Sequence, residues 1–149
     1  MRKSTTLLGI VSLALFLVAG AAVLAIAARN STLDGEGRQF VAAAIPAIFT
    51  HWDERELISR ASPELQHAVN DWELDRLFSG MSRKLGGLQS CERVDGNTSI
   101  SMETGGIVIS GEYVAKTEFA AGSADIRLSL IRKSGNWQIL SFRLNSDLF

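Results

Sequence analysis

The chain has 149 residues, enough for one domain, and its composition, 46% hydrophobic and 21% charged, is that of a folding protein and not of a disordered one. Three of its 15 Lys and Arg residues precede Asp34, so the part from Asp34 onward carries 12 basic and 16 acidic side chains, a formal charge of −4. A nucleic-acid-binding domain would need a basic patch, and this balance argues against one.

The first element is an uncharged apolar run, Leu7 to Ala28, which is long enough to cross a bilayer as a helix. Arg2 and Lys3 precede it, and basic residues tend to remain on the cytoplasmic side. Residues 1–28 are therefore predicted to be a single-pass anchor in the inner (cytoplasmic) membrane, with the N-terminus inside and the domain in the periplasm or exterior. The alternative is a signal peptide, because Ala25 to Ala27 forms an A-x-A site, and cleavage near Ala27 would release the domain.

The polar residues 29–37, RNSTLDGEG, contain two glycines and predict a short tether between the membrane and a domain over 38–149. From Arg38 onward, apolar residues recur at helical intervals: Phe40, Ala43, Ala44, Ala47 and Ile48. Pro46 removes an amide donor and is expected to kink or end this helix.

Two short helices are predicted next. The segment HWDERELISRA can form a helical turn or two with Trp52, Leu57 and Ile58 inward. The following Ser62-Pro63-Glu64 has a serine cap, a proline at the first helical position and an acid at the positive end of the helix dipole. This pattern predicts that a helix begins there.

The last predicted helix is DWELDRLFSGMSRKL, capped by Asn70 and stopped by Gly86-Gly87. Its apolar residues have helical spacing and are expected to face inward: Trp72, Leu74, Leu77, Phe78, Met81 and Leu85.

After Gly87 the apolar period changes to two, which indicates strands. Leu88 to Val94 predicts one strand, Asp95-Gly96-Asn97 a turn, and Thr98 to Met102 a short second strand. Ile107 to Phe119 predicts a long strand, with seven residues on one face: Ile107, Ile109, Gly111, Tyr113, Ala115, Thr117 and Phe119.

The chain then returns along Ala124 to Lys133, and Ser134-Gly135-Asn136 predicts a tight hairpin into the final strand, WQILSFRLN. Long strands joined by short turns form an antiparallel meander. Gly111, in the middle of its strand, is a candidate bend or bulge. Helices followed by such a sheet predict an α+β fold in which the helices pack on one face of a curved antiparallel sheet.

Four segments carry a family resemblance: ASPEL, WELDRLFSGMSRKLGGLQS, EYVAKTEF and RLSLIRKSGNWQILSFRL with its Gly-x-Trp-x-Ile core. Together they resemble the small bacterial members of the NTF2-like, or cystatin-like, superfamily of cone-shaped α+β domains of unassigned function, over about residues 38–146. The resemblance implies a conical pocket between the sheet and the long helix, and a possible homodimer through the outer sheet face. No catalytic motif of the superfamily's enzymes aligns with this chain residue by residue.

The candidate pocket residues are Tyr113, Trp52, His51 and Trp137, although an ordinary core or surface position is the simpler interpretation of each. His51 and Asp53 are two residues apart and would point in different directions on a helix, so they do not predict a dyad. No spacing typical of metal ligands is present, and neither a metal nor a cofactor is predicted. Cys91, the only cysteine, cannot form an intrachain disulfide and is expected to be a small buried apolar residue.

These observations favour a non-enzymatic, membrane-tethered extracytoplasmic domain that binds a protein partner or a small apolar ligand. One alternative is a small hydrolase or isomerase with an apolar pocket around Tyr113 and His51. Another is a scaffold component of an envelope or secretion complex, in which the transmembrane helix itself makes contacts. A deep cavity in which Tyr113 and His51 converge with a carboxylate would distinguish the enzyme from the two other hypotheses.

Overall fold

The computed structural model describes the backbone of residues 2–149 and the side chains of Ala21, Leu24, Ala25 and every residue from Ala28 onward. The chain forms two compact units, Met1–Leu33 and Asp34–Phe149. The expected membrane anchor falls mostly on residues whose side chains lie outside the described part. Among the residues that are described, no helix combines the length and the hydropathy that a membrane span requires.

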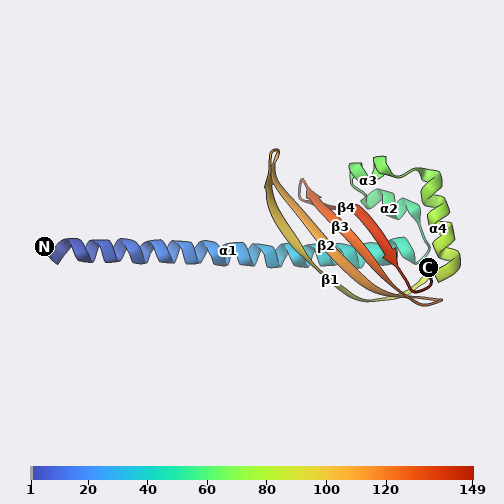
Figure 1. The fold of residues 1–149 in the computed structure, drawn as a ribbon, viewed down its shortest axis with the longest axis horizontal. Helices are drawn as coiled ribbons and strands as arrows, with labels where there is room; N and C mark the ends of the chain where they lie inside the picture. The colour runs from blue at the N-terminus through green and yellow to red at the C-terminus, as the bar shows by residue number, and fades with distance from the viewer. Residues whose placement is uncertain (1) are drawn as a thin grey trace. The chain divides into compact units, whose positions relative to one another are not determined.

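The first element, α1 (Arg2–Phe49), runs through the segment expected to be a tether (Figure 1). Residues 29–37 are helical, and the second unit begins at Asp34 and not at Arg38. The glycines of this segment lower helix propensity, but the lack of a side chain at Gly37 is used in packing, as described below. Pro46 lies inside α1, which ends soon after it, at Phe49.

The buried face of α1 differs from the expected one. Ala44 and Ile48 are buried as predicted, but Ala43 is exposed. From Phe40 to the end of α1, the other buried residues are Val41, Ile45 and Phe49. The inward face is therefore rotated by about one residue.

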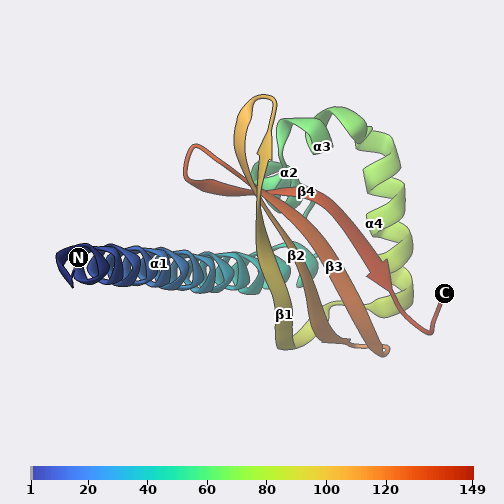
Figure 2. The same ribbon diagram turned by 60° about the vertical axis from the view of Figure 1, so that its left-hand side comes forward.

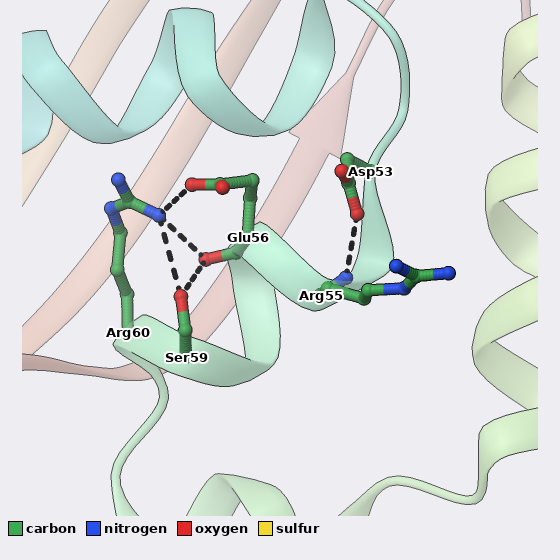
Figure 3. Close-up of polar contacts among 5 residues, drawn as sticks. All are labelled: Asp53, Arg55, Glu56, Ser59 and Arg60. Atoms are coloured by element: carbon green, nitrogen blue, oxygen red, sulfur yellow. Dashed lines mark hydrogen bonds and ion pairs between the residues drawn. The ribbon is translucent and has the colours of Figure 1, made fainter.

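Three short helices follow at the predicted places: α2 (Glu54–Arg60), α3 (Pro63–Ala68) and α4 (Asp71–Leu85). The Asp53 carboxylate caps α2 by accepting a hydrogen bond from the Arg55 backbone N–H at 2.9 Å, and Arg60 pairs with Glu56 one turn earlier (Figure 3). Ser62 caps α3 in the predicted way, accepting from the Leu65 N–H at 3.3 Å. Local capping chemistry thus explains where these helices begin.

The four strands form one antiparallel meander in the order β1-β2-β3-β4, which confirms the α+β prediction. The strands are β1 (Leu88–Glu103), β2 (Gly106–Phe119), β3 (Ser123–Lys133) and β4 (Asn136–Asn145). Figure 2 shows the sheet curving around the helical layer. Its inner face supplies much of the core: Tyr113, Ala115, Phe119, Ile126, Leu128, Leu130 and Ile139.

The predicted turn at Asp95-Gly96-Asn97 is wrong, because β1 runs through it without a break. Gly96 pairs with Tyr113 of β2, and a Cβ atom at Gly96 would lie 2.2 Å from the Glu112 carbonyl oxygen. The glycine is therefore present for close packing of two strands and not for a turn.

The predicted bulge at Gly111 is also misplaced, since the pairing of β2 is regular there. One irregularity lies between β3 and β4, where Ser129 pairs with Ser141 but Leu130 pairs with Ile139. Leu140 is the extra residue, and it interrupts the alternation of inward and outward side chains along β4. Ile139 and the half-buried Phe142 consequently share the inner face.

Candidate binding site

Tyr113 is 1% exposed and lies in a cradle of three glycines: Gly37 of α1, Gly96 of β1 and Gly111 of β2. A Cβ atom at these positions would lie 2.2 to 2.6 Å from atoms of Tyr113 or, for Gly96, of the backbone beside it. Such distances are far shorter than van der Waals contact. The glycines therefore allow the tyrosine ring to fill the space between α1 and the sheet, where the resemblance implies a pocket.

The Tyr113 hydroxyl is fully engaged in this position. It donates to the Asp34 carbonyl at 3.3 Å and lies 3.1 Å from the Thr98 hydroxyl. The Asp34 carboxylate in turn accepts from the Thr98 backbone N–H at 2.6 Å. Burial raises the pKa of Tyr113 above its ordinary value, so the phenol keeps its proton near neutral pH and does not act readily as an acid. We call this arrangement of Asp34, Gly37, Thr98 and Tyr113 the tyrosine lock, because it fastens α1 to β1 and β2.

Trp52 is also a core residue, 8% exposed. Its indole N–H donates to the Gly86 carbonyl at 2.7 Å, and its ring stacks on Phe119 with centroids 5.6 Å apart. The backbone at Trp52 has a φ of 54°, which is unusual for a bulky residue and is held by these contacts. Trp52 therefore joins the end of α1 to the end of α4.

The two remaining pocket candidates differ in burial, since Trp137 packs against the edge of the core and His51 does not. His51 is exposed in the turn after α1, and its neighbour Asp53 is occupied as the cap of α2. Trp137 is half-buried on β4, with the Arg132 guanidinium 6.0 Å from its ring centroid. In the described part of the chain, the Tyr113 hydroxyl bonds to Thr98 and Asp34 and to neither His51 nor Trp137, so a pocket shared by these residues stays a prediction.

The other reactive groups give no catalytic set in the described part of the chain. His67 is exposed, and its Nδ1–H donates to the Pro63 carbonyl at 2.5 Å. Cys91 is half-buried, and burial raises the pKa of its thiol, which makes it a weak nucleophile. Among the described residues, no group of three His, Cys, Asp or Glu side chains is placed to hold a metal ion.

A groove of about 380 Å³ lies between α4 and the C-terminal residues, and we call it the α4 groove. Its lining residues are Arg76, Leu77, Gly80, Met81, Lys84, Leu144 and Phe149. Leu77 is 47% exposed and Phe149 is 56% exposed, although both side chains are large and apolar. The groove thus presents apolar surface that the domain itself does not cover.

The charged residues of the α4 groove are both basic, although the net charge from Asp34 onward is negative. The Lys84 ammonium lies 4.9 Å from the centroid of the Phe149 ring, within the range of a cation–π interaction. Arg76 lies 5.9 Å from the ring of the exposed Trp72. The apolar surface is consequently flanked by positive charge.

The helical spacing of the sequence does not reveal this groove, because it places Trp72 and Leu77 on the inward face of the helix. The buried residues of α4 follow a narrower stripe: Leu74, Phe78, Met81 and Leu85. The apolar face that the sequence predicts for α4 is wider than the stripe that the domain buries, so its extra residues must lie at the edge of the buried stripe. This difference in width is the sequence signal that could have indicated the groove. The contribution of Phe149 could not be found in this way, because it depends on where the C-terminus lies in the fold.

No protein-family model, curated protein or solved structure matches this chain. The NTF2-like assignment therefore stays a prediction from the sequence, and the site has to be interpreted from its own geometry.

Proposed function

We propose that the domain is a binding module that holds an apolar segment of a partner protein in the α4 groove. The observation that carries this proposal is the exposed apolar lining of the groove, in which Leu77 and Phe149 are both about half exposed. Exposed apolar surface rimmed by polar residues is typical of interaction sites. A volume of about 380 Å³ is enough for a few side chains of an inserted segment.

Charge defines the partner further. Arg76 and Lys84 flank the apolar lining, and no acidic residue lines the groove. A segment with Asp or Glu beside its apolar residues would match both features, and complementary charge favours the correct orientation of binding. The partner proposed is therefore an acidic, apolar peptide segment.

The proposal includes an anchor and a fold assignment. We propose that Leu7 to Ala28 holds the domain at the outer side of the cytoplasmic membrane, supported by the length of the uncharged run and by Leu24, which is 72% exposed. The order of helices and antiparallel strands supports an NTF2-like arrangement. The mass of the protein recovered from membranes tests the anchor: a chain that retains its N-terminus is expected, and a chain cut near Ala27 would contradict it.

Site-specific cross-linking tests the binding site. A photoreactive amino acid placed at Leu77 of the full chain in native membranes is expected to form one defined adduct. Mass spectrometry of the adduct should identify a segment that combines apolar residues with Asp or Glu. The same probe at exposed His51 is the control and should give no such adduct. The proposal fails if Leu77 gives none, or if both positions give the same one.

The charge requirement has its own test with a matched control. Lys84→Glu reverses a charge that lines the groove, whereas Arg83→Glu reverses its neighbour in the last turn of α4, which does not line it. Both changes disturb the helix dipole equally. We expect Lys84→Glu to weaken partner binding roughly tenfold, or about 1.4 kcal/mol, and Arg83→Glu to have little effect. Equal effects would mean that the charge of the groove is not recognised.

A further inference from the structure

The outer face of the sheet, away from the helices, contains a second pocket, of about 280 Å³. Its lining residues come from three neighbouring strands: Glu112, Arg127, Ser129, Ser141 and Arg143. All five are polar or charged, in contrast to the α4 groove. The pocket is distinct from the proposed partner site in both position and chemistry.

Strand register brings the two arginines together. Arg127 of β3 pairs directly with Arg143 of β4. Residues opposite each other on antiparallel strands project to the same face, with Cβ atoms roughly 4.5–5.5 Å apart, and like charges in this relation are destabilising. The fold thus places an unfavourable charge pair in the lining of a pocket, where both arginines are exposed.

Other basic residues on this face are neutralised by neighbours. Arg93 pairs with Asp95 at 2.5 Å, and Lys116 pairs with Asp125 at 2.7 Å. Within the part of the chain that the structure describes, neither Arg127 nor Arg143 forms an ion pair. Their two guanidinium groups therefore remain available to an anion.

The remaining lining residues add a second charge and two hydroxyls. Ser129 pairs with Ser141 across β3 and β4, and Glu112 of β2 pairs with Ser129 on its other side. Glu112, Ser129 and Ser141 thus form one row across the three strands, and Arg127 and Arg143 lie in the next row on this face, beside the two serines. The carboxylate of Glu112 is therefore at one corner of the pocket, and the two arginines are on the opposite side. A simple anion would meet the arginines but also the negative charge of Glu112.

We propose that this pocket binds a small zwitterion, with its oxyanion on Arg127 and Arg143 and its ammonium group on Glu112. Guanidinium groups bind carboxylate and phosphate oxygens through paired hydrogen bonds, so either oxyanion satisfies the arginine end. Ser129 and Ser141 can donate further hydrogen bonds to the same oxyanion. An ammonium group matches Glu112 and distinguishes the ligand from a simple anion.

Calorimetric titration of the full chain in detergent tests this assignment. Glycine is the carboxylate probe and phosphoethanolamine is the phosphate probe, and the tighter of the two identifies the oxyanion. We expect a dissociation constant of about 1 mM or lower for the preferred probe. Acetate, inorganic phosphate and methylammonium each match only one end of the pocket and should bind about tenfold more weakly. No binding by either zwitterion, or equal binding by the simple ions, would overturn the proposal.

Three variants locate the binding. Arg143→Gln and Glu112→Gln should each abolish zwitterion binding, whereas Arg93→Gln, on the same face but already paired with Asp95, should retain it. Without a probe, Arg143→Gln should raise the midpoint of thermal unfolding by about 1–4 °C, because it removes the like-charge pair. That rise shows that the variant is folded. Zwitterion binding that persists in Arg143→Gln or disappears in Arg93→Gln would overturn the proposal.

Discussion

The tyrosine lock and the α4 groove are two helix contacts built in opposite ways. At the lock, α1 meets the sheet through the buried Tyr113 ring, through hydrogen bonds to the carbonyl and the carboxylate of Asp34, and through three glycines that leave room for the ring. At the groove, α4 leaves Leu77 and Phe149 about half exposed beside the C-terminus. Tyr113, the only tyrosine of the chain, is enclosed by packing and hydrogen bonds, whereas the proposed binding site lies where packing is incomplete.

One glycine in each helix shows the same contrast. A Cβ atom at Gly37 would lie 2.2 Å from the Tyr113 hydroxyl oxygen, whereas one at Gly80 would meet nothing within 4 Å. Gly37 is required for close packing, and Gly80 leaves space. Substitutions can therefore either fill the α4 groove or disturb the packing of the tyrosine lock.

The largest expected effect is at the centre of the lock. Tyr113→Ala should lower the free energy of unfolding by about 3–5 kcal/mol, because it leaves a large cavity between α1 and the sheet. Tyr113→Phe should cost only about 1 kcal/mol, since it removes the hydroxyl and keeps the ring. Urea unfolding of the full chain, followed by tryptophan fluorescence, gives both values. Similar small losses for the two variants would show that the ring is not a packing element.

The two glycines should respond to the same substitution with opposite sign. Gly37→Ala should destabilise the domain by about 1–3 kcal/mol, because Tyr113 has to move. Gly80→Ala should stabilise it by about 0.5–1 kcal/mol, because alanine favours the helix and has room. Gly35, which also has open space around it, is the matched control within α1, and Gly35→Ala should resemble Gly80→Ala. A gain in stability at Gly37 would contradict the lock.

The smallest effect concerns an exposed ion pair between α3 and β3. The ammonium of Lys133 lowers the pKa of Glu64 from 4.5 to about 2. A depressed folded pKa contributes stability above pH 4.5 that is lost as the pH falls toward 2. Lys133→Gln should therefore reduce the loss of stability over this window in acid titrations. Because both groups are exposed, the difference should be small and should diminish with added salt.

Local signals predicted much of the fold. The Ser62 hydroxyl caps the start of α3, and Gly86 ends α4 with a positive φ. Ser134-Gly135 adopts the positive φ angles that a tight hairpin needs. Such features depend on neighbours in sequence, so composition and spacing are sufficient to find them. The order of the elements follows from them.

The predictions from the sequence are wrong where contacts between distant parts of the chain determine the local structure. Asp95-Gly96-Asn97 has turn chemistry, but pairing with Tyr113 keeps it extended. The bulge at Leu140 changes which residues of β4 face inward, and no local pattern marks it. The two candidate sites could not be predicted from the sequence for the same reason. Phe149 lies beside α4, and Arg127 beside Arg143, only after the chain has folded.

Cross-linking from Leu77 in three backgrounds tests the central claim most directly. Gly80→Trp fills the α4 groove from its open side, Gly80→Ala controls for the loss of glycine, and the double variant His51→Ala and Tyr113→Phe removes the groups of the rival pocket. We predict that the partner adduct disappears only in Gly80→Trp. An adduct that persists in Gly80→Trp, or that is lost from the folded double variant, would contradict the assignment of binding to the groove.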